Sequence, residues 1–155
     1  LPTPATTVHG HRMRGSVAVT GIEGGSGWNV IPEGCSVTVD ERTVPGERVP
    51  LDRAEDVAGV EWVVDQDLPP MACDDAGFAD AALVAADAAQ SGTPEYVVKP
   101  HATDAGWLAG DGTTCVVAGA SEPGEAHTAD ESVAIDVLER CRRLYQDLAE
   151  RWPAE

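Results

Sequence analysis

The chain has 155 residues, a length that accommodates one domain or two small ones. It carries 27 acidic residues against 10 basic ones, a net charge of −17, and Lys99 is its single lysine. A surface this acidic repels nucleic-acid phosphate and anionic membrane, so the composition excludes both as partners. The charge pattern favours a protein of a high-salt cytoplasm, where salt screens the self-repulsion, and a merely acidic surface is the alternative.

The sequence contains no run of roughly 18 apolar residues that would span a membrane, and no basic-then-apolar secretory leader is visible. Its four cysteines share no close spacing, so neither a zinc cage nor a thioredoxin motif is indicated. Three of them, Cys35, Cys115 and Cys141, fall on apolar positions and are expected to be reduced core residues. Reduced cysteines predict a cytoplasmic protein.

The first part of the chain predicts two antiparallel strands. Residues 1–13 hold two prolines and a His-x-His pair, and we expect a poorly ordered lead-in without a strand or helix to fix that pair as a metal site. Residues 14–23 and 35–43 alternate apolar and polar side chains, as half-exposed strands do. On the second strand, the side chains expected to face inward are Cys35, Val37 and Val39.

A short helix over residues 51–58 and a further strand over 60–65 complete a β–β–α–β order. The dipeptide Pro69-Pro70 ends this unit, because proline cannot continue a strand or helix that precedes it. Residues 14–68 are therefore expected to form one small antiparallel domain.

Residues 71–155 alternate helical patterns with short apolar strands. The expected elements are a helix that Asp74-Asp75 caps and that runs to Ala89, a strand over 96–98, a short helix over 105–109, a strand over 113–118, and a long helix that begins between 130 and 135. Helices that alternate with strands imply a helix-covered, mainly parallel sheet. The predicted fold class is α/β.

His127 lies on the predicted loop between the strand 113–118 and the last helix. In α/β proteins, loops at the carboxyl ends of strands carry chemistry, and neutral imidazole is the commonest nitrogen ligand of zinc. A simpler interpretation takes Thr128 and Glu131 as a capping box at the start of the helix, with His127 only preceding the cap. The loop by itself leaves both interpretations open.

Two groups of motifs follow one another along the chain. They are Gly24-Gly25, Asn29-Val30-Ile31-Pro32, Cys35 and Asp40-x-Arg42 in the first group, and Thr103-Asp104-Ala105, the Gly119 loop and Ala126-His127-Thr128-x-x-Glu131 in the second. This pattern resembles the zinc aminoacylase/carboxypeptidase family, which includes acetylornithine deacetylase, succinyl-diaminopimelate desuccinylase and glutamate carboxypeptidase. Two matches in the right order are more specific than one.

The resemblance implies how the two halves are used. Residues 14–68 resemble the second half of the family's lid, or dimerisation domain, which is a four-stranded antiparallel sheet of ferredoxin-like arrangement with two helices on one face. Residues 71–155 resemble the C-terminal part of the catalytic α/β domain. On this basis the chain is expected to be a fragment, with the N-terminal half of the parent enzyme missing.

The resemblance also assigns candidate site residues. His127 matches a zinc ligand, and Asn29 and Arg42 match lid positions that hold the substrate's carboxylate, for which an arginine fork is suited. Thr103 and Gly119 match loop positions near the substrate. The alternatives are a surface charge for Arg42, a turn-capping amide for Asn29 and plain loop flexibility for Gly119.

The implied function is hydrolysis of an amide bond in N-acyl amino acids or short peptides with a free carboxylate. Zinc activates water for this chemistry, with two ions per active site in the intact protein and with cobalt or manganese as possible substitutes. The family's other ligands and its glutamate base are not found, so the chain by itself is expected to be inactive. Expected partners are the substrate, the missing N-terminal half and a second copy bound through the lid. The alternative function is a non-catalytic dimerisation or binding module.

Overall fold

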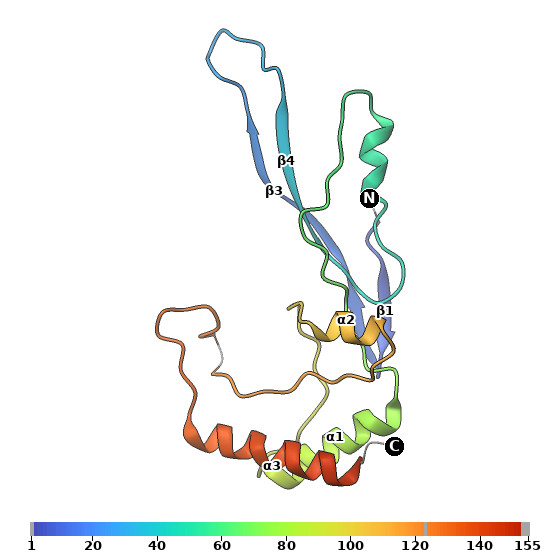
Figure 1. Ribbon diagram of the computed structural model, residues 1–155, viewed down its shortest axis with the longest axis vertical. Coiled ribbons are helices and arrows are strands. Elements are labelled where there is room, and N and C mark those ends of the chain that lie inside the picture. Colours follow the sequence, from blue (N-terminus) through green and yellow to red (C-terminus); the bar gives the residue numbers. More distant parts are fainter. Residues whose placement is uncertain (1, 123, 153–155) are drawn as a thin grey trace. The chain divides into compact units, whose positions relative to one another are not determined.

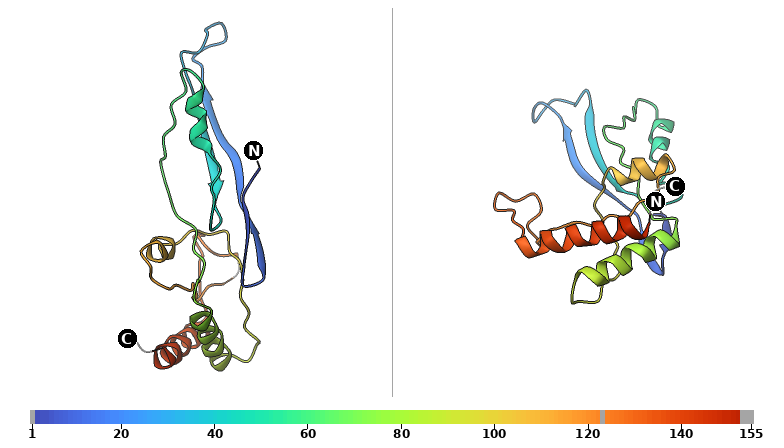
Figure 2. Two further views of the ribbon diagram at one scale, coloured as in Figure 1. Left: turned by 90° about the vertical axis from the view of Figure 1, so that its right-hand side faces the viewer. Right: turned by 60° about the horizontal axis from the view of Figure 1, so that its bottom comes forward.

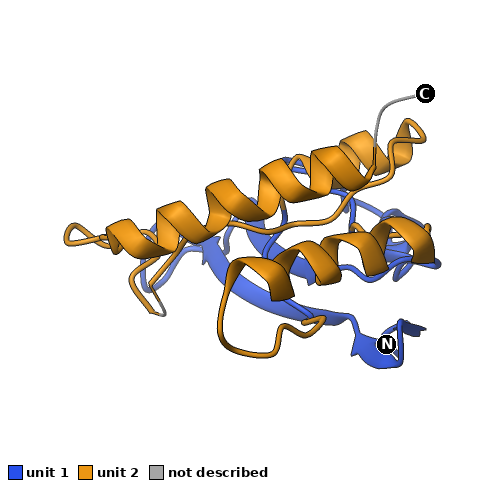
Figure 3. Ribbon diagram, turned by 90° about the horizontal axis from the view of Figure 1, so that it is seen from below, with its two compact units in different colours: residues 1–70, 98–102 blue, residues 71–97, 103–155 orange. Residues whose placement is uncertain are grey.

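The computed structural model describes residues 2–122 and 124–152. The chain divides into two compact units (Figure 3). The first runs up to Pro70 and includes Val98–Ala102, and the second contains Met71–Val97 and the chain from Thr103 onward. The first unit contains two antiparallel strand pairs and one short 3-10 helix, and the second unit contains α-helices, so the predicted α/β class is confirmed at the level of a mixed α/β protein.

The first unit begins with a hairpin of β1 (Ala5–Val8) and β2 (His11–Arg14). The two residues between the strands, His9 and Gly10, both have positive φ angles, 46° and 81°. A two-residue turn of this kind matches the right-handed twist of the flanking strands, and glycine adopts it without strain. The expectation of a poorly ordered lead-in over residues 1–13 is therefore wrong for the hairpin, because the His-Gly pair is a turn signal.

The longer hairpin pairs β3 (Ser16–Gly24) with β4 (Cys35–Arg42), in a register from Ser16 opposite Arg42 to Gly24 opposite Cys35. Figure 2 shows this pair as a long two-stranded ribbon. Both strands lie where the sequence predicts them, but the face predicted to point inward is not buried. Cys35 is exposed and Val37 is 51% exposed, since two strands alone leave their outer half without a packed layer in the described part of the chain.

The base of the long hairpin carries the small core of the first unit. Val44 and Val49 are buried there, and the backbone amide of Val49 donates to a Glu41 carboxylate oxygen at 3.0 Å. Arg48 bridges Glu41 at 3.5 Å and Asp67 at 2.9 Å. These contacts fold the segment after β4 back against the strand.

The helix expected over residues 51–58 is present as a short 3-10 helix, η1 (Leu51–Asp56). The strand expected over 60–65 does not form, so the predicted β–β–α–β order stops after its helix. Val63 and Val64 of this segment are 70% and 60% exposed. An apolar run has strand propensity, but it becomes a strand only when a neighbour accepts its hydrogen bonds.

Two helices form the core of the second unit, α1 (Ala76–Ala89) and α3 (Ile135–Arg151), which pack side by side (Figure 1). Asp75 caps α1 as the sequence predicts, because its carboxylate accepts a 3.0 Å hydrogen bond from the Phe78 amide. At the C-terminal end of α1, the guanidinium of Arg143 in α3 donates to the Ala89 carbonyl at 3.2 Å. The buried residues of α1 are Ala79, Ala85 and Ala89, which are small enough to let the helices approach closely.

The parallel sheet predicted for residues 71–155 is not found among the described residues, in which both strand pairs are antiparallel and belong to the first unit. The segments 96–98 and 113–118 are extended chain that is not assigned as strand in the described residues. Val97 and Val117 are each 61% exposed, whereas Cys115 is buried. Between these segments lies the short helix α2 (Ala105–Gly110), at the predicted position.

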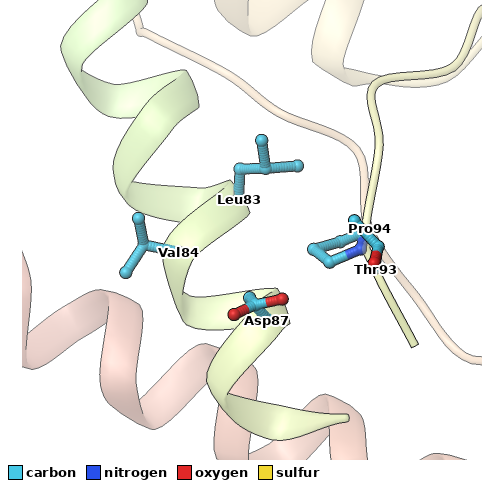
Figure 4. Close-up of a pocket in the computed structure, with 5 residues that line it drawn as sticks. All are labelled: Leu83, Val84, Asp87, Thr93 and Pro94. Atoms are coloured by element: carbon cyan, nitrogen blue, oxygen red, sulfur yellow. The ribbon is translucent and has the colours of Figure 1, made fainter. Parts of the chain in front are cut away.

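One open hollow is lined by Leu83, Val84 and Asp87 of α1 and by Thr93 and Pro94 of the chain that follows the helix (Figure 4). Its lining is mainly apolar and holds a single carboxylate. None of the candidate site residues lines it. Across residues 2–122 and 124–152, no helix is long and apolar enough to cross a membrane.

Candidate functional site

The loop that carries His127 does not have the predicted capping box. Helix α3 begins at Ile135, its N-cap is Ala134, and no side chain caps it there. The Thr128 hydroxyl donates instead to the backbone carbonyl of Glu125 at 2.7 Å. His127 is therefore not the residue before a helix cap: it lies in a separate turn, is exposed, and has a φ of 64°.

Two carboxylates hold this loop together. One Glu125 carboxylate oxygen accepts hydrogen bonds from both the amide and the hydroxyl of Ser132, each at 2.8 Å. Glu122 accepts from the Ala134 amide at 3.4 Å, which places a negative charge near the start of α3, where the helix dipole favours it. Sequence reasoning missed both residues, since neither belongs to a periodic pattern.

Arg42, the last residue of β4, lies in the first unit. Its Nε donates to an Asp40 carboxylate oxygen at 2.8 Å, and a terminal nitrogen donates to the carbonyl of Pro100 at 3.4 Å. The side chain is 56% exposed. A guanidinium has five N–H donors, so these two contacts leave donors with which Arg42 can bind an added carboxylate.

Asn29 lies at the tip of the long hairpin, in the connection between β3 and β4. The backbone amide of Val30 donates to the Gly27 carbonyl at 3.4 Å, which makes a turn around Trp28 and Asn29. Asn29 is exposed, and its neighbour Trp28 is fully exposed. The amide of Asn29 is thus accessible on a turn. This position is compatible with the carboxylate-binding role and with the turn-capping role.

Thr103 and Gly119 lie in the second unit. The carbonyl of Thr103 accepts a 3.1 Å hydrogen bond from the Gly106 amide at the start of α2, and the residue is exposed. Gly119 is exposed too, and a Cβ atom there would lie 3.9 Å from the Tyr145 hydroxyl. Burial raises the pKa of Tyr145, with a smaller contribution from Cys141. The backbone at Gly119 is open to an approaching ligand except on the side of Tyr145.

The candidate residues divide between the units: Asn29 and Arg42 belong to the first, whereas Thr103, Gly119 and His127 belong to the second. His101 follows Pro100, whose carbonyl Arg42 contacts, and it is exposed and belongs to the first unit. Its place beside the Arg42 contact was not apparent from the sequence, because residues 42 and 100 are far apart along the chain.

A complete catalytic zinc site does not fit the described residues by themselves. A catalytic zinc normally takes three protein ligands, mostly histidine and carboxylate. Among residues 2–122 and 124–152, no three or more His, Cys, Asp or Glu side chains form a group that could hold a metal ion. His127 offers one exposed imidazole, so this chain can supply one ligand of such a site.

The comparison with protein families identifies the chain. A model described as peptidase family M20/M25/M40 matches residues 6–151, which is nearly the whole chain. No curated protein and no solved structure matches. The chain therefore belongs to peptidase family M20/M25/M40, and the resemblance found in its motifs is confirmed. Members of this family are hydrolases of the metallopeptidase class, and they typically use divalent metal ions.

Proposed function

We propose that this chain supplies the substrate-binding lid residues and one metal ligand of a metal-dependent amidohydrolase. Its substrates are N-acyl amino acids or short peptides with a free carboxylate. The observation that carries the proposal is the family match over residues 6–151, together with the exposed His127 on a loop held by hydrogen bonds. The metal is zinc, two ions per active site, with cobalt or manganese as substitutes.

His127 is the proposed metal ligand of this chain. The remaining ligands and the carboxylate base are proposed to come from the N-terminal half of the same protein. The chain by itself is then inactive. Thr103 and the backbone at Gly119 are proposed to line the substrate, which their exposure permits.

Arg42 is the proposed anchor for the substrate's carboxylate, with Asn29 as an amide donor. The Asp40 carboxylate holds the Nε side of the guanidinium, and this contact fixes its plane at the end of β4. A fixed fork binds a carboxylate through two parallel hydrogen bonds with less loss of side-chain entropy than a mobile one. Substrates with a free carboxylate are favoured for this reason.

The two units are proposed to be part of the lid, residues 14–68, and the C-terminal part of the catalytic domain, residues 71–155. The apolar segment 113–118 supports this proposal, because it has the composition of a buried strand but belongs to no ladder among the described residues. In the intact enzyme it is proposed to pair with a strand of the N-terminal half in a parallel sheet.

A second copy of the chain is proposed to bind the lid. The long hairpin has two open edges, and Val19, Ile22 and Val37 are between 51% and 68% exposed on it. Open edges with exposed apolar side chains favour association. The same feature supports the second candidate function, a non-catalytic dimerisation module. Sedimentation over a range of concentrations tests the dimer, and hydrolysis by the intact protein separates the two functions.

We also propose a cytoplasmic location at high salt. Cys35, Cys115 and Cys141 are free thiols, as a reducing compartment requires, and the net charge of −17 is tolerated best where salt screens repulsion. Urea unfolding at increasing potassium chloride concentration tests the proposed adaptation to high salt. The free energy of unfolding is expected to rise with salt, and a decrease would contradict the proposal.

The substrate proposal is tested on the protein expressed from its full coding sequence. Arg42→Ala is expected to raise KM about 10- to 100-fold for N-acetyl amino acids, because a charged hydrogen-bonded anchor is lost. For the corresponding N-acetyl amino acid amides, which lack the carboxylate, KM is expected to stay unchanged. Arg53→Ala is the matched control, since Arg53 is 71% exposed and pairs only with Asp56 within its own short helix among the described residues. Equal effects of Arg42→Ala on acids and amides would show that Arg42 does not bind the carboxylate.

A further inference from the structure

We infer that Glu125 is a positioning residue that holds His127 in the conformation in which its imidazole is presented to a ligand. The inference rests on the proposed role of His127. Glu125 lies two residues before His127, and it contacts the chain on the far side of the histidine through both its backbone and its side chain.

Four hydrogen bonds converge on this one glutamate. Its backbone carbonyl accepts from the Thr128 amide at 3.0 Å and from the Thr128 hydroxyl at 2.7 Å. Its carboxylate accepts from the Ser132 amide and from the Ser132 hydroxyl, both at 2.8 Å. The backbone bonds close a tight turn around His127, and the carboxylate bonds close a wider loop around the same residue.

The backbone of His127 needs such support. A φ of 64° lies in the left-handed region, which side chains other than glycine, asparagine, aspartate and histidine seldom adopt. A residue keeps this conformation only when its surroundings determine it. The hydrogen bonds of Glu125 to Thr128 and Ser132 span His127 most closely, and the longer bond from the Ala134 amide to Glu122 spans it more widely.

Burial sets Glu125 and Glu122 apart from the other acidic residues of this loop. Both are half-buried, whereas Asp130 and Glu131 are exposed. Of the two, Glu125 lies within two residues of His127, and its carboxylate is directed into the loop, where it accepts both hydrogen bonds from Ser132. Hydrogen bonds to an ionised acceptor are stronger than bonds between neutral groups.

The functional consequence is pre-organisation of a ligand. Residues that orient a metal ligand, without touching the metal, commonly change affinity or activity about 10- to 100-fold when they are removed. If the loop around His127 loosens, the imidazole samples many directions, and binding must then order it. Because Glu125 fixes the loop before a metal binds, less conformational entropy of the imidazole is lost on binding.

The direct test is nuclear magnetic resonance on the isotope-labelled chain. A left-handed residue brings its amide proton close to its own α proton, which gives a strong intraresidue Overhauser signal. Glu125→Ala is expected to weaken this signal at His127 and to speed amide exchange at Ser132 about tenfold or more, because the acceptor is lost. Glu125→Gln is expected to retain both features, since its amide oxygen still accepts from Ser132.

Asp130→Ala is the matched control, because Asp130 is an exposed carboxylate in the same loop. It is expected to leave the His127 signal and the Ser132 exchange unchanged, and far-ultraviolet circular dichroism verifies that each variant is folded. The inference is overturned if Glu125→Ala leaves both readouts intact, or if Asp130→Ala changes them equally.

A second experiment separates this inference from the proposed function. In the protein from the full coding sequence, Glu125→Ala is expected to weaken zinc affinity about 10- to 100-fold. Loss of the His127 resonance signature without any change in zinc affinity would refute the positioning role. If His127→Ala itself leaves zinc content unchanged, the proposed metal role fails, whereas the resonance result still decides how Glu125 shapes the loop.

Discussion

The phenolic hydroxyl of Tyr145 in α3 donates a hydrogen bond of 2.7 Å to the backbone carbonyl of Ala118. Ala118 is the last residue before Gly119, where the candidate loop begins, and the loop ends where α3 starts at Ile135. The same helix therefore fixes both ends of the loop that carries His127. A rigid element under both ends of a loop is a common way to position a functional side chain.

Removal of this anchor is expected to cost little stability but to loosen the loop. Tyr145→Phe deletes one hydroxyl, and the free energy of unfolding is expected to fall by about 0.5 kcal/mol, the lower end of the range for one hydrogen bond, because Ala118 is exposed to water. Urea unfolding measures the change, and amide exchange at Gly119 and Ala120 reports the loop. An unchanged exchange rate at these residues would show that the hydroxyl does not anchor the loop.

The two tyrosines predict a loss of stability in alkali. Burial raises the pKa of Tyr145, and burial followed by the hydrogen bond to Asp80 raises the pKa of Tyr96, both from the ordinary value of 10.0. The folded state then keeps protons that the unfolded state releases, so this stabilisation is fully present below pH 10 and is lost as pH rises through the folded pKa values.

Ultraviolet absorbance of the phenolate follows this ionisation in the native and in the urea-unfolded chain. The native midpoint is expected above the unfolded one, and the free energy of unfolding is expected to decline across that interval. Tyr145→Phe is expected to make the decline shallower. Coincident native and unfolded midpoints would contradict the raised pKa of both phenols.

The cap of α1 is expected to be worth about 1 kcal/mol, the usual value for an aspartate N-cap. Asp75→Ala removes the 3.0 Å bond to the Phe78 amide, so urea unfolding should shift to lower concentration, whereas Asp75→Asn should retain most of the stability. Asp74→Ala is the control, because the neighbouring Asp74 is exposed. Equal losses for the Asp74 and Asp75 variants would indicate a general charge effect and no specific cap.

Alkylation of the cysteine side chains is expected to follow their exposure. Cys35 is exposed and Cys115 is buried, so iodoacetamide should modify Cys35 first. Burial raises the pKa of Cys73, and less thiolate means slower attack, because the thiolate is the nucleophile. Mass spectrometry of timed samples measures the order. Modification of Cys115 ahead of Cys35 would contradict the packing of the second unit.

Local patterns in the sequence predict those elements that local interactions determine. The alternation of 16–24 and 35–42, the Asp75 cap and the start of α3 agree with the structure because each depends on neighbouring residues. The apolar runs 60–65 and 113–118 have the composition of strands, but strand formation depends on a partner that composition does not specify.

In the candidate site, too, local motifs could be predicted from the sequence, whereas contacts that depend on the fold could not. His127 could be nominated because it belongs to a short motif of adjacent residues. Glu125 could not, since its importance comes from contacts with Thr128 and Ser132 that depend on how the loop folds. The contact between Arg42 and Pro100 joins residues that are 58 positions apart, and no sequence pattern links them.

The most direct measurement of the central claim is zinc content and hydrolysis in the protein expressed from its full coding sequence, for the parent and for His127→Ala. His11→Ala is the control, because His11 is an exposed histidine on β2. We expect the control to keep its zinc and its turnover of N-acyl amino acids. We expect His127→Ala to lose bound zinc and at least about 100-fold in turnover, since a ligand should matter no less than the residues that orient it. Full zinc content and full turnover in His127→Ala would contradict the account.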